Sequence, residues 1–304
     1  MPTHRRRFLA GAASLSLSAC ARPKRSTVSS ESTLMPTIFL PHGGGPWTIA
    51  DMGMTKEYAP LRQYLAGLGE NLPTKPKAIL CVSAHWEAEV PTVQSAPRPP
   101  MLYDYYGFPP ETYTFEWPAP GAPETAALVR DHLAHAGFEA AADGDRGFDH
   151  GTFVPLMIPF PEADMPTFQL SLLGSLDPAA HLAMGRALAP LRREGVLIVG
   201  SGMSYHNMQG FMAAMRGGPG RAQVESESKA FDAWLAESVA MPSDQRTQRL
   251  VEWARAPAAR ACHPREEHLL PLMVAAGAAE SEPAELALQM SLAGTHVSAV
   301  HFGV

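Results

Sequence analysis

The segment Ala78–His85, which reads Ala-Ile-Leu-Cys-Val-Ser-Ala-His, decides the fold class of this chain. Its first six residues form a short, mostly apolar run without the alternation of a half-exposed strand. Such a run predicts a strand that is buried on both faces. Three other runs have the same character: Thr37–Leu40, Thr167–Leu172 and Val196–Gly200.

The segments between these runs have helical character, and glycines follow three of them closely, as is common at helix ends. The expected helices are Glu57–Leu68, Pro123–Ala136, Ala179–Arg193, Val224–Ala240 and Pro264–Ala278. Strands alternate with helices, which predicts βαβ units. We therefore expect one α/β domain over residues 36–304, with a mainly parallel mixed sheet flanked by helices.

Three histidines stand just beyond predicted strands. His42 follows the first strand and precedes three glycines, His85 ends the second, and His206 lies shortly after the last. In an open α/β sheet, ligands bind beyond the carboxyl ends of the strands. We therefore expect these three side chains to face one crevice.

Two more histidines lie in contexts that suit a site. His150 follows Asp149, which would be able to orient its ring, in a turn-like loop. His268 is expected near the start of the last helix, with Arg265 and Glu266 or Glu267 as partners, and His263 in the same segment is a rival. Neutral imidazole suits Fe(II) and Zn(II), so these histidines are candidate metal ligands.

The first residues predict export and a lipid anchor. Arg5–Leu9 has a twin-arginine pattern, and Leu17–Cys20 reads as a lipobox, in which Cys20 is lipidated and the chain is cleaved just before it. The apolar stretch between them is too short to span a bilayer. We expect a signal peptide over residues 1–20, a flexible tether over 21–35 and a periplasmic protein held to the membrane only by its lipid.

Composition excludes several classes of protein. The formal net charge of −6 and the pI near 6.1 argue against nucleic-acid binding. No Cys-x-x-Cys pair is present, which removes zinc-ribbon and thioredoxin-like interpretations. Cys81 and Cys262 are expected to be ordinary core thiols, although an exported protein would also permit a disulfide between them.

An aromatic, proline-rich loop occupies residues 101–120. It is either a packed flap or a lid over an aromatic substrate. Tyr105, Tyr106 and Phe108 are candidate contacts for a substrate ring, as is Trp86 beside His85, and core packing is the alternative for each.

Six motifs follow one another in order: His42–Gly45, Ser83–Trp86, Asp104–Pro109, Arg146–Gly151, Gly200–Asn207 and Glu267–Leu272. Together they resemble the class III extradiol ring-cleavage dioxygenases of the LigB-like, 4,5-DOPA dioxygenase type. The resemblance spans the chain from Pro36 to its end. It implies a phosphorylase/hydrolase-like, LigB-like α/β fold and a non-haem metal enzyme that inserts both atoms of O2 into a catechol-type ring.

The resemblance also implies roles for single residues. His42, His85 and His268 fall on metal-ligand positions, and His206 on a position that is either a further ligand or the acid/base histidine. His150 falls on a position of the substrate pocket, and either His150 or His206 would donate a proton during cleavage. Asn207, an amide hydrogen-bonder beside His206, is a candidate substrate contact. Fe(II) is the expected metal, with Zn(II) as the alternative.

Two other functions use the same residues. A zinc hydrolase would employ the histidines to lower the pKa of a bound water. A non-catalytic periplasmic lipoprotein would bind a metal or a phenol without turnover. The sequence does not identify the natural catechol, the cleavage position or the oligomeric state.

Overall fold

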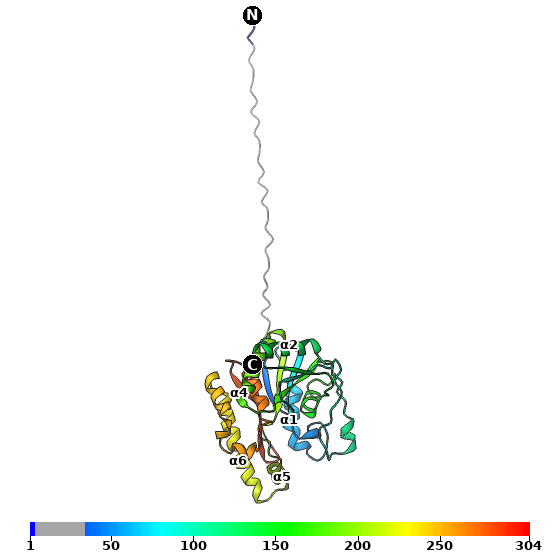
Figure 1. The fold of residues 1–304 in the computed structure, drawn as a ribbon, viewed down its shortest axis with the longest axis vertical. Coiled ribbons are helices and arrows are strands. Elements are labelled where there is room, and N and C mark those ends of the chain that lie inside the picture. The colour runs from blue at the N-terminus through cyan, green and yellow to red at the C-terminus, as the bar shows by residue number, and fades with distance from the viewer. Residues whose placement is uncertain (4–33) are drawn as a thin grey trace. The chain divides into compact units, whose positions relative to one another are not determined.

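The four apolar runs lie side by side in the middle of one sheet of the computed structural model, which describes residues 1–3 and 34–304 (Figure 1). They are β5 (Thr167–Leu173), β2 (Ala78–Ala88), β6 (Val196–Gly202) and β1 (Thr37–Pro41). Every neighbouring pair among these four is parallel. The predicted fold class is thereby confirmed.

Shorter or more exposed strands extend this parallel centre at both edges. β3 (Thr92–Gln94) and β4 (Ala141–Asp143) follow β5, while β8 (Thr295–Phe302) and β7 (Ala284–Leu292) follow β1. β3 is antiparallel to β5, and β8 is antiparallel to both β1 and β7. The sheet is therefore mixed, with the order β4-β3-β5-β2-β6-β1-β8-β7.

The α-helices include all five predicted regions and four further segments. They are α1 (Thr55–Leu68), α2 (Pro123–His135), α3 (His150–Leu156), α4 (Pro178–Leu188), α5 (Met208–Arg216), α6 (Pro219–Val239), α7 (Ser243–Val251), α8 (Ala259–Cys262) and α9 (Leu270–Ala278). Short 3₁₀ turns span Gly45–Thr48, Pro110–Thr114, Ala189–Glu194 and Trp253–Arg255. The last predicted helix begins at Leu270 and not at Pro264, so His268 lies just before it.

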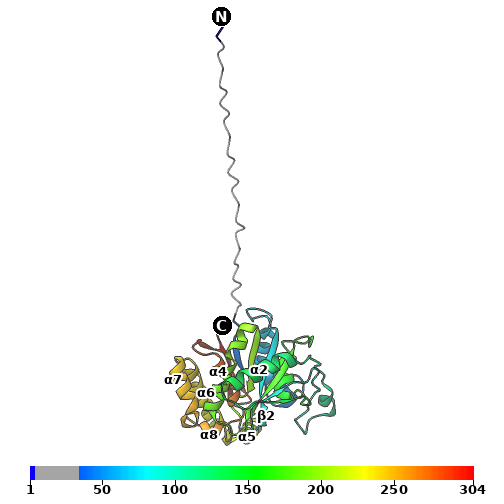
Figure 2. The ribbon, with the colours of Figure 1, turned by 45° about the horizontal axis from the view of Figure 1, so that its top comes forward.

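Helices cover both faces of the sheet. On β8, Ser298 contacts Asp232 of α6, whereas His301 contacts Tyr64 of α1. Successive side chains of a strand point to opposite faces, so α1 and α6 lie on opposite sides of the sheet. Figure 2 shows α6 beside α7, and these two helices pack against each other.

The helix α9 packs on the central strands. Thr37 of β1 donates a hydrogen bond to the carbonyl oxygen of Ala275, and the strands beneath α9 are wholly buried. A Cβ atom on Gly202, at the end of β6, would overlap the carbonyl oxygen of His268. The absence of a side chain at Gly202 thus lets the segment before α9 approach the carboxyl end of β6.

The predicted signal peptide, lipidation site Cys20 and most of the predicted tether fall on residues 4–33, outside the described residues. Met35, at the end of the predicted tether, is buried, and its carbonyl oxygen accepts a hydrogen bond from Arg192 at 2.6 Å. Among the residues that the structure describes, no helix has the length and apolar character needed to cross a membrane.

Candidate metal centre and active site

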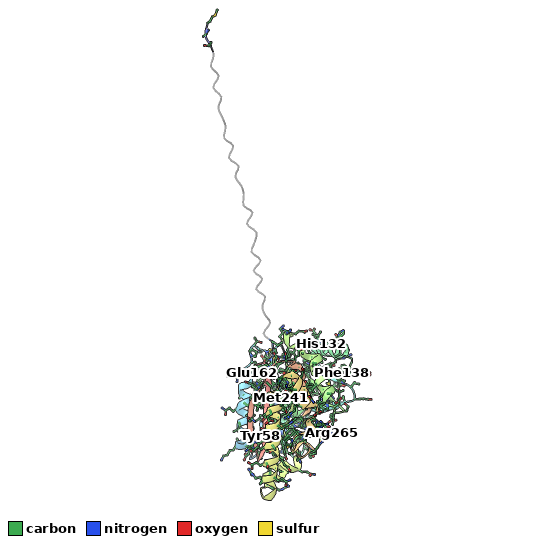
Figure 3. The ribbon with its side chains drawn as sticks, turned by 90° about the vertical axis from the view of Figure 1, so that its left-hand side faces the viewer. Tyr58, His132, Phe138, Glu162, Met241 and Arg265 are labelled. Atoms are coloured by element: carbon green, nitrogen blue, oxygen red, sulfur yellow. The ribbon has the colours of Figure 1, made fainter. Side chains whose placement is uncertain are left out.

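The five candidate histidines line one cavity at the carboxyl ends of the parallel strands. His42 follows β1, His85 lies in β2, His150 begins α3, and His206 precedes α5. His268 lies just before α9. Figure 3 labels Tyr58, which also lines the cavity, below Glu162, which precedes β5.

The backbone at two strand ends brings His85 and His42 to the cavity. On β2, Val82 pairs with Leu170 and Glu87 with Leu172, so extra residues of β2, including His85, bulge between these pairs. Bulges of this kind redirect a side chain next to a site. His42 remains paired with the end of β6, because its backbone N–H donates to the carbonyl oxygen of Gly202 at 3.1 Å.

Three ring nitrogens converge inside the cavity. The Nε2 atom of His85 lies 3.1 Å from Nε2 of His42 and 3.3 Å from Nε2 of His268. Nitrogens bound to one ion at about 2.1 Å lie about 3.0–3.4 Å apart when the angle at the ion is between octahedral and tetrahedral. Both separations from His85 therefore fit a metal ion shared with its two neighbours.

The hydrogen-bond network explains why these nitrogens face each other. Ser201 Oγ donates to the carbonyl oxygen of Gly151, so it accepts from Nδ1–H of His42 at 3.0 Å. Nδ1–H of His268 donates to the Glu267 carboxylate at 2.8 Å. With its hydrogen on Nδ1, each of these neutral rings presents a bare lone pair on Nε2. A cation between the lone pairs would relieve their repulsion.

The three rings are held neutral, which is the form that binds metals. Burial, followed by the charges of neighbouring histidines, keeps the pKa of His42 and that of His268 well below the usual 6.5. Burial and then His150 lower the pKa of His85 to about 3. His42 is 1% exposed and His268 is 4% exposed.

Two carboxylates each link a ring of this trio to a further histidine. Asp104 lies 3.6 Å from Nδ1 of His85 and 2.8 Å from Nδ1 of His150. Glu267 lies 2.8 Å from Nδ1 of His268 and 3.0 Å from Nδ1 of His206. Both carboxyl groups are partly buried. Burial is the largest effect and raises their pKa, but the hydrogen bonds and favourable charge interactions around each group together outweigh it, so each pKa lies below its usual value.

His206 differs in position from the converging trio. Its ring stacks on that of His268, with 3.3 Å between the ring centroids and 17° between the planes. Donor atoms of His206, Glu267 and His268 lie within 4.8 Å of one another, so a ligand role for His206 remains compatible with the geometry. Nδ1 of His206 is bonded to Glu267, which leaves Nε2 to accept a proton.

The cavity has a volume of about 510 Å³ and a largely aromatic wall. Tyr105, Tyr106, Phe108 and Asn207 line it, together with Trp47. Asn207 also caps α5: its side chain accepts from Gly210 N at 3.0 Å and donates to the carbonyl oxygen of Ala261 at 2.8 Å.

Trp86 does not line the cavity, which corrects its expected role as a substrate contact. Side chains alternate along a strand, so Trp86 points away from the side that His85 occupies. Its ring instead lies under the guanidinium of Arg146, 4.4 Å from the centroid.

Asp149 does not orient His150, contrary to the sequence-based hypothesis. The carboxylate that contacts the ring belongs to Asp104, which lies in one of the six motifs but was assigned no role. Asp149 is fully buried and accepts hydrogen bonds from Ser83 at 2.8 Å and Gln169 at 2.6 Å. It therefore ties β2 and β5 to the start of α3, and positions His150 only through the backbone.

The candidate residues between His263 and His268 occupy different surroundings. His263 is fully buried away from the cavity, and its Nε2 lies 3.0 Å from the carbonyl oxygen of Ser204. Glu267 is the partner of His268, whereas Glu266 pairs with Arg260. Arg265 pairs with Glu87 through two contacts of 2.5 and 2.6 Å.

Cys81 and Cys262 are buried free thiols, as expected of core residues. Burial raises the pKa of both, so neither is an activated nucleophile.

Comparisons with known proteins agree with this arrangement. A family model described as the catalytic LigB subunit of aromatic ring-opening dioxygenase matches residues 35–303. A Beta vulgaris protein named 4,5-DOPA dioxygenase extradiol is 40% identical over 260 residues, covering 84% of this chain and 92% of that protein. The dioxygenase tasH of Hapsidospora irregularis is 41% identical over 261 residues, covering 82% of this chain and 79% of its own.

A solved structure shares the fold. The crystal structure of an uncharacterized protein from Escherichia coli K12 superposes with a TM-score of 0.70 at 29% identity. The match covers 88% of this chain and 100% of that chain.

Proposed function

The chain belongs to the LigB family of aromatic ring-opening dioxygenases, and from that premise we propose that it opens a catechol-type ring beside its two hydroxyl groups. We assign the metal to the three Nε2 atoms of His42, His85 and His268. The observation that carries this assignment is their spacing of 3.1 and 3.3 Å, with Nδ1–H of His42 and of His268 bonded on the outer side.

Fe(II) is the metal that we propose, and Zn(II) is the alternative. Three neutral imidazoles suit both ions. When bound, Fe(II) supplies Lewis acidity toward the catechol oxygens and redox chemistry with O2, whereas Zn(II) has no redox chemistry.

The protons of the catechol are handled by the chain itself in this proposal. His206 takes a hydroxyl proton on Nε2, and the Glu267 carboxylate, 3.0 Å from Nδ1, stabilises the resulting imidazolium. His150, held by Asp104 at 2.8 Å in the same manner, takes the second hydroxyl proton and returns it during cleavage. The aromatic wall of Tyr105 and Phe108 packs against the ring and excludes water.

The test is anaerobic reconstitution of the full chain with Fe(II), followed by O2 uptake with a panel of catechols. We expect stoichiometric O2 consumption and a yellow ring-opened product, both lost in His42→Ala and His85→Ala. His135→Ala is the matched control, because His135 is exposed on α2. It should retain the activity of the unmodified chain.

Two other outcomes would replace this proposal. Hydrolysis of a colourless ester or amide by the zinc-loaded chain, without O2 uptake, would establish the zinc hydrolase. Tight binding of a metal or phenol without any turnover would establish the binding protein.

For localisation we propose twin-arginine export and a lipid anchor on Cys20, supported by the motifs in Arg5–Leu9 and Leu17–Cys20. Export of an already folded protein would allow the metal to be acquired before the protein leaves the cytoplasm.

A further inference from the structure

Beyond the histidines, the cavity is walled by apolar side chains. They come from separate parts of the chain: Trp47, Phe108, Phe211 and Met212 of α5, and Leu292 at the end of β7. The ring of Trp47 lies 5.5 Å from that of Phe108 and 6.1 Å from that of Phe211, between centroids. These contacts make the aromatic part of the wall continuous.

Charged side chains are absent from this wall: no Lys, Arg, Asp or Glu is among the described residues that line the cavity. Asp104 and Glu267 stand behind the histidine rings, and each lies within 4 Å of the Nδ1 atoms of two of them. Arg265 lines a smaller neighbouring pocket, where its guanidinium is paired with Glu87.

The polar groups that remain in the wall are neutral, and several are already engaged. Tyr58 Oη accepts from Gly44 N at 3.0 Å, and Thr295 Oγ1 donates to the carbonyl oxygen of Leu292 at 2.8 Å. Tyr205 is 4% exposed, and its hydroxyl forms no hydrogen bond with the part of the chain that the structure describes. A hydroxyl of this kind recognises a neutral polar group and does not balance a charge.

The cavity exceeds the needs of catechol itself. At roughly 30 Å³ for each water-sized group, 510 Å³ accommodates about 17 such groups. Catechol has eight non-hydrogen atoms. The ring of a bound catechol near the histidines would therefore leave room for a substituent against the apolar wall.

We propose that the substrate of this site is a catechol with an uncharged, apolar substituent, and not a charged catechol such as the zwitterionic amino acid DOPA. This inference rests on the ring-opening function proposed above. A carboxylate or ammonium group placed against Trp47, Phe211 and Leu292 would lose its hydration without gaining a partner. An alkyl or aryl group in the same place would gain from leaving water.

The first test compares kcat/KM of the Fe(II)-loaded full chain for four compounds. They are catechol, 4-butylcatechol, 3-(3,4-dihydroxyphenyl)propanoate and DOPA. We expect 4-butylcatechol to exceed each charged compound at least tenfold. If catechol is turned over and a charged compound has a kcat/KM equal to or above that of 4-butylcatechol, this inference is overturned. The ring-opening function would remain intact.

A second test does not depend on turnover. Calorimetric titration of the zinc-loaded chain with 4-butylcatechol and with the propanoate should give a dissociation constant at least tenfold lower for the butyl compound. Equal dissociation constants would overturn the inference even if no catechol, substituted or not, is turned over. If no catechol is turned over, the ring-opening function fails as well, and that result is distinct from the comparison of dissociation constants.

A charge placed in the wall should change the preference. Met212 is 38% exposed on α5, so Met212→Arg introduces a cation at the cavity without burying it. We expect the dissociation constant for the propanoate, divided by that for the butyl compound, to be at least tenfold lower in Met212→Arg than in the unmodified chain. Leu128→Arg, on the exposed side of α2, adds the same charge away from the cavity and should leave the ratio unchanged. An unchanged ratio in Met212→Arg would contradict the assignment of this wall to the substituent.

Discussion

Glu267 accepts hydrogen bonds from Nδ1 of His268 at 2.8 Å and from Nδ1 of His206 at 3.0 Å through the same oxygen, Oε1. Asp104 likewise lies between two histidines: one carboxylate oxygen is 2.8 Å from Nδ1 of His150, and the other is 3.6 Å from Nδ1 of His85. The proposed metal ligands and the proposed acid/base residues therefore share their supporting carboxylates. A change in either carboxylate should affect both metal binding and catalysis.

Glu267→Gln should weaken metal binding about 10–100-fold, because its amide is a poorer acceptor for the N–H groups that fix the two rings. The zinc affinity of the folded variant, measured by competition with a chelator, tests this. Glu266→Gln is the matched control, since Glu266 pairs with Arg260. An affinity loss of the same size in both variants would show that the effect is not specific to Glu267.

His206→Ala should separate metal binding from catalysis. We expect one bound metal per chain but a fall in kcat of about 10²–10⁴-fold, the usual contribution of a general base. Metal content by elemental analysis and O2 uptake with a catechol are the two measurements. His42→Ala should lose the metal. Loss of the metal in His206→Ala as well would establish His206 as a ligand.

Acid should destabilise the fold through histidines outside the cavity. Burial lowers the pKa of His301 to about 4 and that of His263 to about 4, against 6.5 in an unfolded chain. Below pH 6.5 the unfolded state binds more protons at these groups, so the stability present above pH 6.5 falls until about pH 4. Each group should cost about 1.4 kcal/mol at pH 5.5.

The variant His301→Gln tests this pH dependence. Glutamine retains an acceptor for the Tyr64 hydroxyl, which lies 2.6 Å from His301 Nε2, but does not titrate. The fall in melting temperature from pH 7.5 to pH 5.5 should be smaller in this variant than in the unmodified chain. His135→Gln, a change at an exposed histidine, should leave that fall as it is. An identical fall in melting temperature in all three proteins would show that His301 does not contribute to the pH dependence of stability.

Gly202→Ala should lower stability by about 1–3 kcal/mol, the usual cost of forcing extra volume into a packed interior. The added methyl group would overlap the carbonyl oxygen of His268. Since this displaces a proposed ligand, zinc affinity should fall together with the free energy of unfolding. Gly174→Ala has ordinary contact distances and serves as the control. Unchanged zinc affinity in folded Gly202→Ala would argue against this coupling.

Cys20→Ala should release the protein from the membrane fraction, because the proposed lipid would have no attachment point. Fractionation of cells that express the full chain measures this. Substitution of Arg5 and Arg6 by lysine should instead leave the protein in the cytoplasm. Equal membrane association with and without Cys20 would rule out the anchor.

The sequence was sufficient to predict the centre of the sheet. The runs that became β1, β2, β5 and β6 are apolar throughout because both of their faces are covered, and such runs are recognised without an alignment. β3 and β4 have three residues each, which is too short for a pattern. β7 is half-exposed, and polar residues interrupt it, so it lacks the continuous apolar run of the central strands.

The site could be predicted only in part. The positions of His42 and His206 beyond strand ends indicated their common location. The role of Asp104 depends on the contact of its loop with His150 at the start of α3, and no local pattern encodes that contact. The prediction that Trp86 contacts the substrate was wrong, because the alternation of side chains through the bulge of β2 decides which neighbour of His85 faces the cavity.

The pairing of two carboxylates with four of the five histidines has a consequence for electroneutrality. Asp104 and Glu267 together carry two negative charges, which would match a divalent cation among three neutral rings. An uncharged catechol would then enter a site of zero net charge. If its protons pass to His206 and His150, they remain beside the same carboxylates, and the site as a whole keeps its zero net charge.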